Sequence, residues 1–224
     1  MELPEILTFD AMSPRELVLR IWLGLKMAFS KKSYLVKTGF MYSKIKDSLR
    51  NKDGEYLPWM NYSIIRLFDE RLTNDLTVFE YGSGSSTMYF AKRVGSIMSV
   101  EYNQTWFDTV QKMTNDAANA QVKFVELGED YHRSIKLLGG GQRFDIVLVD
   151  GRDRVESAIF SFDYLTPGGV IILDDSARPH YSPAFDFFRQ RGYKALTLVG
   201  LKPTGFSTDT TTIFYKSGEN CLDL

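Results

Sequence analysis

From about Leu76 to its C-terminus, the chain alternates short apolar runs rich in β-branched residues with amphipathic stretches of helical length. This alternation is typical of a parallel sheet whose strands are joined by crossover helices. The clearest run, residues 144–150, is apolar at most positions, which predicts a strand buried on both faces. We therefore predict an α/β fold with a mostly parallel sheet and helices on both faces.

The individual elements are predicted from these runs and from the Gly and Pro residues between them. Strands are expected at residues 76–81, 96–101, 122–127, 144–150, 170–173, 195–200 and 211–216. Helices are expected at residues 85–94, 105–118, 154–165 and 182–191. A loop rich in Gly, Pro and Thr joins the last two strands, so we expect these strands to pair antiparallel.

Residues 1–55 are predicted to form an N-terminal helical extension to a domain at residues 56–224. Ser13 and Pro14 suit the N-cap and first position of a helix, whose apolar side chains mostly share one side. Between Arg15 and Lys46, eight Lys or Arg accompany a single Glu. Residues 13–50 are therefore a candidate for contact with an acidic membrane surface. The alternative is that this helix packs on its own domain or in a homodimer.

Composition narrows the cellular context and the kinds of partner. The chain has 27 Lys plus Arg against 28 Asp plus Glu, so its net charge does not indicate a nucleic-acid partner. The single cysteine, Cys221, excludes an intramolecular disulfide and suits a reducing compartment. The first apolar run, residues 17–29, lacks a small-residue cleavage site and is shorter than the about 20 residues that cross a bilayer. We expect a cytoplasmic protein.

The turn after the first predicted strand, residues 80–87, reads Glu-Tyr-Gly-Ser-Gly-Ser-Ser-Thr. Ligands of open α/β sheets bind beyond the carboxyl ends of the strands, and glycine there lets the backbone approach them. A dinucleotide fingerprint requires a third glycine where Thr87 stands, and a P-loop requires a lysine that this turn lacks. Glu101 ends the second predicted strand, where a carboxylate can accept hydrogen bonds from a ribose. A tight turn without a ligand, beside a solvated Glu101, is the alternative.

Four motifs follow one another in a recognisable order: residues 80–87, Ser99-Val100-Glu101, residues 144–151 and residues 165–175. Together they resemble the class I S-adenosylmethionine-dependent methyltransferases, over about residues 56–216. The resemblance implies a Rossmann-like seven-stranded sheet whose last strand is antiparallel. It also implies S-adenosylmethionine as the cofactor.

The resemblance further implies roles for individual residues. Glu80 and the backbone of the glycine turn would hold the methionine end, and Glu101 the ribose. Glu129 or Asp130 would meet the adenine amino group. Trp59 and Tyr62 are candidate wall residues, with core packing as the alternative. The cofactor-binding residues predicted in this way are Trp59, Tyr62, Glu80, Tyr81, Gly82, Ser83, Gly84, Ser85, Ser86, Thr87, Glu101, Tyr102, Glu129, Asp130 and Asp150.

Three carboxylates, Asp150, Asp174 and Asp175, end neighbouring predicted strands, and such a set suits Mg²⁺. The arrangement is similar to the metal-dependent catechol-type O-methyltransferases, except that Arg152-Asp153-Arg154 replaces the lysine expected there. The alternative is that Asp174 and Asp175 cap the next loop or bind Arg178.

Methyl transfer to a hydroxyl requires alignment of the acceptor and a base or a metal. The predicted catalytic residues are Asp150, Asp174 and His180. His180 lies on the loop after Asp175 and could act as a base, or it could be an ordinary exposed histidine.

The favoured function is O-methylation of a small molecule or a sugar. We expect residues 202–209 and the N-terminal segment to shape the acceptor pocket. Two other hypotheses stay open. One is an aminopropyltransferase of the polyamine-synthase type, for which Asp150-Gly-Arg-Asp153 is a partial match. The other is a cofactor-binding module without turnover.

Overall fold

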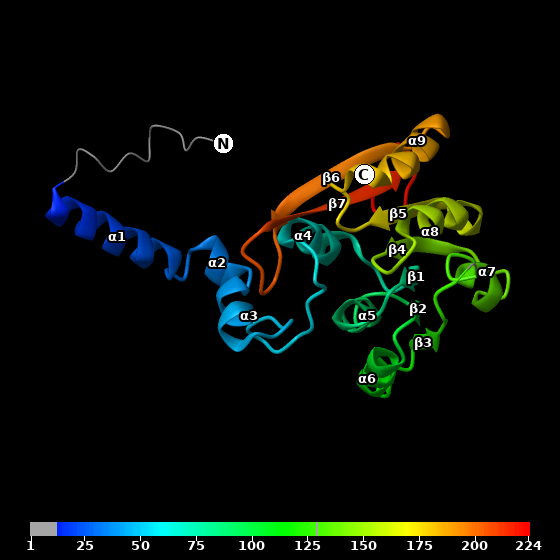
Figure 1. Cartoon of the computed structure of the whole chain (residues 1–224), viewed down its shortest axis with the longest axis horizontal. Helices are drawn as coiled ribbons and strands as arrows, with labels where there is room; N and C mark the ends of the chain where they lie inside the picture. The colour runs from blue at the N-terminus through cyan, green and yellow to red at the C-terminus, as the bar shows by residue number, and fades with distance from the viewer. Residues whose placement is uncertain (1–12, 129) are drawn as a thin grey trace.

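A computed structural model of the chain describes residues 13–128 and 130–224. Seven strands form one sheet in the order β3-β2-β1-β4-β5-β7-β6 (Figure 1). Strands β1 to β5 pair in parallel, whereas β7 is antiparallel to both β5 and β6. The predicted α/β sheet and the antiparallel pairing of its last two strands are confirmed. The strands are β1 (Thr77–Tyr81), β2 (Ser96–Glu101), β3 (Ala120–Phe124), β4 (Phe144–Val149), β5 (Leu165–Leu173), β6 (Lys194–Leu201) and β7 (Thr208–Tyr215).

Helices follow most of the strands, as predicted, but several end earlier than the sequence indicates. The predicted helix at residues 85–94 ends at Ala91, and the one at residues 154–165 ends at Ser161 and continues as a 3₁₀ turn. The helices are α1 (Pro14–Ala28), α2 (Tyr34–Lys37), α3 (Phe40–Lys46), α4 (Tyr62–Arg71), α5 (Ser85–Ala91), α6 (Gln104–Thr114), α7 (Ser134–Leu138), α8 (Arg154–Ser161) and α9 (Ser182–Gln190).

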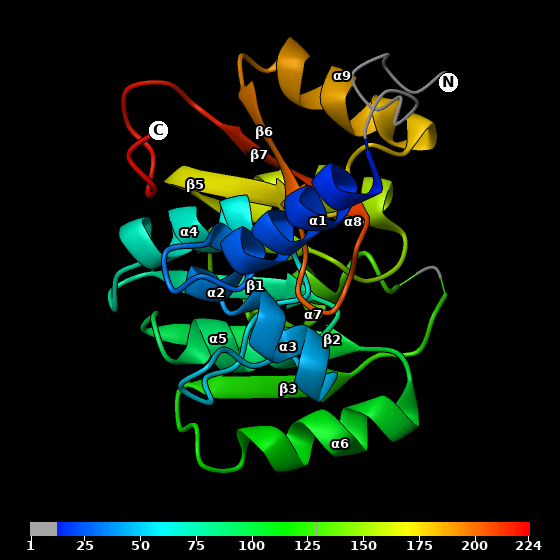
Figure 2. The same ribbon diagram turned by 90° about the vertical axis from the view of Figure 1, so that its left-hand side faces the viewer.

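The sheet buries an apolar layer on each face. On one face, Phe68 of α4 and Phe90 of α5 belong to the same buried cluster as Ile146 of β4. On the other face, α7, α8 and α9 cover a second cluster that includes Val147 and Phe188. Alternate residues of β4 thus point to opposite cores, as expected for a central strand. Figure 2 shows α6 along the lower edge of the sheet, where it packs beside β3.

Strand β1 lies between β2 and β4, so the strand order reverses beside β1. The chain leaves β1 for β2 on one side, and later elements are added on the other side, from β4 onward. In an open α/β sheet this arrangement leaves a crevice at the carboxyl ends of the two strands. The carboxyl ends of β1 and β4 are therefore the expected place for a ligand.

The N-terminal segment contains one projecting helix, followed by residues that join the domain. Ser13 caps α1 as predicted, because its side chain accepts a hydrogen bond from the Glu16 N–H. No residue of α1 is buried, and the helix extends away from the sheet (Figure 1). In contrast, Phe40 of α3 is buried with Leu57 and Tyr62. The apolar core therefore begins within the predicted extension. Within the described ranges, every helix is too short or too polar to traverse a bilayer.

Candidate functional site

A cavity of about 530 Å³ lies at the carboxyl ends of β1, β2, β4 and β5. Pockets for small ligands have volumes of about 300–1,000 Å³, so this cavity is large enough for one. Its place is the crevice expected from the strand order. The residues that line it are Leu49, Trp59, Ser83, Gly84, Ser85, Ser86, Glu101, Tyr102, Asn103, Trp106, Asp150, Arg154, Asp174, Asp175 and Lys202.

The glycine turn forms one wall of this cavity, and Gly82 shows why a glycine is needed. Its φ is +94°, a conformation that residues with a Cβ rarely adopt. A Cβ on Gly82 would also lie 3.2 Å from the backbone carbon and oxygen of Asp150. The turn therefore packs directly on the end of β4, which brings the backbone of residues 83–86 beside Asp150.

Glu80 supports this turn from behind the cavity. Its carboxylate is buried and accepts hydrogen bonds from the hydroxyls of Ser86, Thr87 and Ser99. Burial raises the pKa of Glu80 to about 7, although the three hydroxyls act in the opposite direction. Tyr81 also points into the core, where its hydroxyl donates to the His132 carbonyl at 2.7 Å. Glu80, Tyr81 and Thr87 are not among the residues that line the cavity, and their side chains support the turn from behind it.

Glu101 lies at the cavity with its orientation fixed by the protein. Its side chain is 4% exposed, and its Oε1 accepts from the N–H groups of Tyr102 at 3.0 Å and Asn103 at 2.9 Å. The Ser83 hydroxyl donates to Oε2 at 3.1 Å. These contacts position the carboxylate between the glycine turn and the start of α6, which is where the sequence predicts it.

Trp106 is a cavity residue that the sequence analysis did not identify. Its indole N–H donates to the Ser83 carbonyl at 2.8 Å, and its ring lies 3.4 Å from the position of a Cβ on Gly84. The side chain stays 45% exposed, which is unusual for a large aromatic residue. A tryptophan in the first turn of the helix after Glu101, capped by Asn103, is the signal that could have revealed it.

Carboxyl groups gather where β4 and β5 end at the cavity. Asp174 is 2% exposed and accepts a hydrogen bond from the Thr211 hydroxyl at 2.6 Å. Burial, together with the charges of Asp150 and Asp209, raises its pKa well above the ordinary value. Burial also raises the pKa of Asp150, to about 6, although the Arg154 cation opposes this. These surroundings make Asp174 harder to ionise than an ordinary aspartate, while a pKa of about 6 leaves Asp150 ionised at neutral pH.

Two cations lie among these carboxyl groups. The Arg154 guanidinium is 3.0 Å from Asp150 Oδ1 and 3.3 Å from Asp175 Oδ2, and it donates to the Asp174 carbonyl at 2.7 Å. The Lys202 ammonium is 3.5 Å from both Asp175 and Asp209. Arg154 thus joins the ends of β4 and β5, while Lys202 joins β5 to β7.

These cations decide how well the site fits a magnesium ion. Carboxylate oxygens of Asp174, Asp175 and Asp209 lie within 4.8 Å of one another, so the compact group contains Asp209 in place of the predicted Asp150. Arg154 pairs with Asp150 and Asp175, and Lys202 pairs with Asp175 and Asp209. Asp175 additionally pairs with Arg178, as the alternative prediction states. Two of the three predicted Mg²⁺ ligands, Asp150 and Asp175, are therefore already bound to cationic side chains, which argues against a metal ion there.

Lys202, in the loop between β6 and β7, and Leu49, in the N-terminal segment, also line the cavity. Trp59 is 53% exposed, and the Lys202 ammonium lies 4.5 Å from the centre of its ring. The ammonium of Lys44, in α3, donates to the Thr204 carbonyl at 2.9 Å and lies 4.4 Å from the centre of the Phe206 ring. The N-terminal segment thus braces the loop that carries Lys202.

Three predicted site residues lie elsewhere, and a fourth is outside the described residues. Tyr62 is buried in the core, in edge contact with the Phe40 ring, so the core-packing alternative holds for it. His180 lines a separate cavity of about 390 Å³. Asp130 is exposed and 3.8 Å from Arg133. Glu129, the other residue predicted near adenine, lies outside the described residues.

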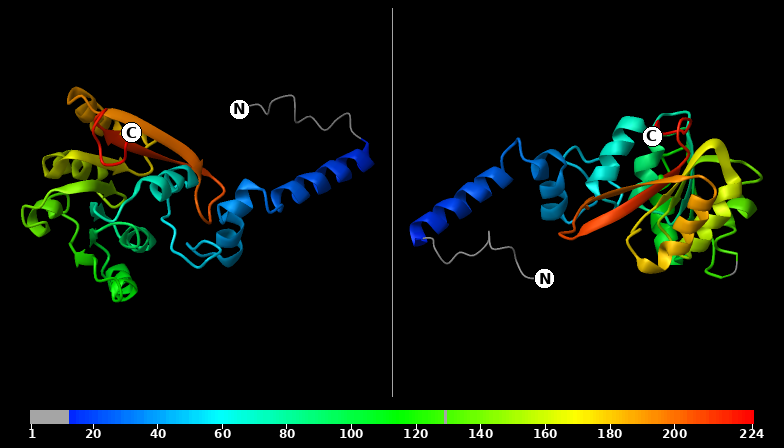
Figure 3. Two further views of the ribbon diagram at one scale, coloured as in Figure 1. Left: turned by 180° about the vertical axis from the view of Figure 1, so that it is seen from behind. Right: turned by 90° about the horizontal axis from the view of Figure 1, so that it is seen from above.

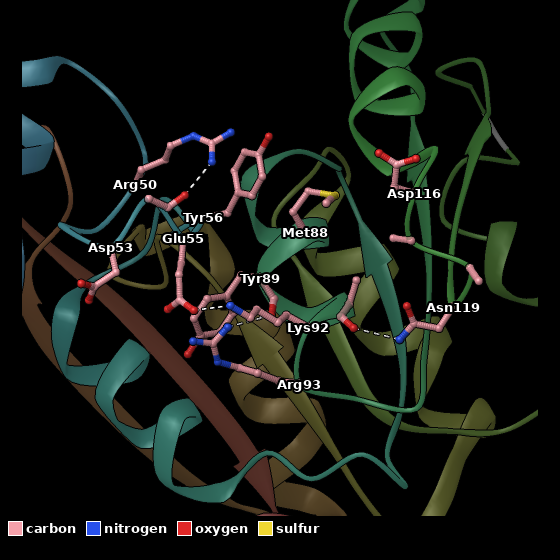
Figure 4. Close-up of a pocket in the computed structure, with 14 residues that line it drawn as sticks. Arg50, Asp53, Glu55, Tyr56, Met88, Tyr89, Lys92, Arg93, Asp116 and Asn119 are labelled. Atoms are coloured by element: carbon pink, nitrogen blue, oxygen red, sulfur yellow. Dashed lines mark hydrogen bonds and ion pairs between the residues drawn. The ribbon is translucent and has the colours of Figure 1, made fainter.

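A larger cavity, of about 650 Å³, lies beside the C-terminal half of α5 (Figure 4). Several of its charged groups already have partners: Lys92 pairs with Glu55, and Arg50 donates to the Gly54 carbonyl at 2.6 Å. It is lined by residues that precede β3 and not by the carboxyl ends of the strands. The candidate site is therefore the cavity that contains Glu101 and Asp150.

Comparison with known proteins supports the fold. No protein-family model and no curated protein matches the chain. The O-methyltransferase TomG from Streptomyces achromogenes, in complex with SAM, is 16% identical, with a TM-score of 0.54 over 92% of this chain and 100% of that one. A putative caffeoyl-CoA O-methyltransferase from Staphylococcus aureus is 12% identical, with a TM-score of 0.52 over 89% and 99%. An rRNA methylase from Streptococcus thermophilus is 12% identical, with a TM-score of 0.54 over 69% and 95%. The chain therefore has the Rossmann-like fold of the class I methyltransferases.

Proposed function

We propose that this chain transfers a methyl group from S-adenosylmethionine to an oxygen of a small molecule or a sugar. The observation that carries the proposal is the cavity where the strand order reverses. It brings together the backbone of a glycine turn, the Glu101 carboxylate, Asp150 and Asp174. Two of the structures that share the fold, TomG and the putative caffeoyl-CoA enzyme, are named as O-methyltransferases.

The residues of the cavity fit the chemical parts of this cofactor. Glu101 Oε1 is saturated by two backbone N–H groups, but Oε2 has only the Ser83 hydroxyl, so it retains acceptor capacity for a ribose hydroxyl. Trp106 offers an exposed aromatic surface beside the turn, suited to an adenine ring. The backbone of residues 83–86 is suited to the methionine carboxylate, because the turn brings it to the cavity wall.

The bound cofactor would supply an electrophilic methyl group on a sulfonium. The chain has to hold the acceptor in line and remove its proton. Asp150 is placed to take that proton, since a pKa of about 6 leaves it ionised at neutral pH and close to the working range of a base. Arg154 holds its carboxylate in place. Asp174, which lines the same cavity and is held by the Thr211 hydroxyl, is placed to orient the acceptor.

His180 has no part in this proposal, because it lines a different cavity from Asp150 and Asp174. The same separation disfavours the aminopropyltransferase hypothesis. That hypothesis requires Asp150 and Asp153 to act together, but Asp153 lines the cavity of His180.

Calorimetric titration with S-adenosylmethionine tests the cofactor assignment. We expect Glu101→Gln to weaken binding by at least about tenfold, because a hydrogen bond to a charged group contributes about 1.5–3 kcal/mol. Glu219→Gln, an exposed carboxylate near the C-terminus, serves as the matched control and should bind like the wild type. Equal affinity of both variants for S-adenosylmethionine would show that Glu101 does not contact the cofactor.

The acceptor class is tested with cofactor labelled in its methyl group. We expect label in pools of hydroxylated small molecules or sugars and none in RNA. Label in RNA alone would reject the small-molecule assignment while leaving the cofactor assignment intact. Tight cofactor binding with no transfer to any pool would favour the module without turnover.

A further inference from the structure

Helix α1 is the most conspicuous feature that the proposed reaction does not use. It projects from the domain in Figure 1 and in both views of Figure 3. None of its 15 residues is buried. Its large apolar side chains are 43–73% exposed, where a domain normally covers such residues. They are Val18, Leu19, Ile21, Trp22, Leu23, Leu25 and Met27, followed by Phe29.

The charges around α1 are almost entirely positive. Arg15 and Lys26 flank one side of the apolar stripe, whereas Arg20 lies on the other face with Leu19, Leu23 and Met27. The stripe itself consists of Leu17, Val18, Ile21, Trp22, Leu25, Ala28 and Phe29. Exposed lysines continue after the helix at Lys31, Lys32 and Lys37. In the part of the chain that the structure describes, none of these cations forms an ion pair. Their charge is therefore available to a partner.

We propose that α1 and the basic turn after it dock in the plane of an anionic lipid surface. Fifteen residues extend about 22 Å, less than the about 30 Å thickness of a hydrocarbon layer, so the helix suits lying in the interface. Trp22, with the Lys26 ammonium 5.0 Å from its ring, combines an apolar body with a cation as interfacial side chains do. The lysines after the helix meet the negative headgroups.

Charge favours this partner over a second copy of the chain. Two copies of α1 packed through their apolar stripes would bring Arg15 and Lys26 of both molecules close to one another, and like charges at an interface cost binding energy. An anionic bilayer covers the apolar stripe and neutralises the same cations. Each basic residue near such a surface strengthens binding by about fivefold.

Flotation of the full chain with lipid vesicles tests the proposal. We expect it to float with vesicles of phosphatidylcholine containing about 30% phosphatidylglycerol, and far less with phosphatidylcholine alone. Ile21→Glu combined with Leu25→Glu should abolish flotation. Lys31→Gln combined with Lys32→Gln should weaken it about 25-fold, from two fivefold losses. The matched control is Lys136→Gln with Leu137→Glu, an exposed pair in α7 that should float like the wild type.

Because no residue of α1 is buried, these variants should melt like the wild type, so a loss of flotation reports on the surface and not on folding. Three results would overturn the proposal. One is a wild-type chain that ignores anionic vesicles. Another is undiminished flotation of the Ile21→Glu and Leu25→Glu variant. The third is a wild-type dimer in light scattering that this variant converts to a monomer, since a second copy would then cover α1.

Discussion

Replacing Arg154 with methionine is the most informative perturbation of the site. The side chain is 12% exposed, and it holds Asp150 and Asp175 by ion pairs and the ends of β4 and β5 through their carbonyl oxygens. Methionine retains much of the apolar volume but removes the charge and every donor. Asp150 then remains in a poorly hydrated position without its cation.

The expected size of the effect follows from these contacts. Removing one partner of a buried ion pair costs about 3–5 kcal/mol. The Asp150 side chain is 26% exposed and Asp175 keeps Lys202 and Arg178, so we expect the lower end, about 3 kcal/mol. For a chain of this size the melting temperature should fall by about 6–12 °C at pH 8.

The effect should depend on pH in a defined direction. Burial already raises the pKa of Asp150 to about 6, and losing Arg154 raises that pKa further. An acid whose pKa is higher in the folded state destabilises the protein as pH rises from its unfolded pKa of about 4 through its folded pKa. The loss should therefore be smaller at pH 5, where Asp150 takes up a proton in the variant, than at pH 8.

Thermal unfolding of the Arg154→Met variant at both pH values provides the assay. Arg189→Met serves as the control, because its ion pair with Asp186 is solvent-exposed and should contribute less than about 1 kcal/mol. An equal loss of stability at pH 5 and pH 8 would show that Arg154 does not stabilise the ionised form of Asp150. A loss no larger than that of the control would refute the assignment of Arg154 as the central cation of the site.

Other perturbations test separate parts of the structure. Gly82→Ala places a Cβ against the Asp150 backbone at positive φ, so we expect the free energy of unfolding to fall by about 1–3 kcal/mol in a thermal unfolding experiment. Unchanged stability would contradict the packing of the turn on Asp150. Methyl transfer should fall as the pH drops through about 6, where Asp150 takes up a proton, and a flat profile would exclude Asp150 as the base. A chelator should leave the activity unchanged, since Arg154 and Lys202 already pair with the carboxylates of Asp150, Asp175 and Asp209. Inhibition that Mg²⁺ reverses would show that the reaction uses a metal ion. Burial raises the pKa of the Cys221 thiol to about 12, so a thiol reagent should modify it slowly at pH 8 until the chain is unfolded, and rapid modification would count against this burial.

Strand β5 illustrates what local sequence patterns predict and what they miss. Its apolar end, residues 170–173, is recognisable, but Pro167-Gly168-Gly169 reads as a break, so the predicted strand begins five residues late. In the structure β5 begins at Leu165, and residues 166–169 bulge outward opposite the single residue Asp145 of β4. Proline is tolerated there because a bulge leaves ladder positions unpaired. Only the pairing of Leu165 with Phe144 of β4 shows that β5 begins before the bulge.

The residues of the candidate site likewise fall into those that local sequence patterns predict and those that they miss. The glycine turn, Glu101 and Asp150 are recognisable because each ends a strand in a local motif. Arg154 and Lys202 come from different parts of the chain, and their closeness depends on the pairing of β4, β5 and β7. A charged residue in a loop gives no local sign of which carboxylate it will meet. The same limit explains why Asp150 and Asp174 suggested a metal site, since the cations beside them could not be placed from the sequence.

The contact between Lys44 and Thr204 joins positions 160 residues apart, and it has a consequence for how the molecule is assembled. Residues 80–151, which surround Glu101 and the turn, are linked by short connections, and such segments come together early because little loop entropy is lost. The wall that carries Lys202 requires the hairpin of β6 and β7, which follows all the other strands in the chain. During synthesis, we therefore expect the part of the crevice around Glu101 to form before β6 and β7 complete the opposite wall.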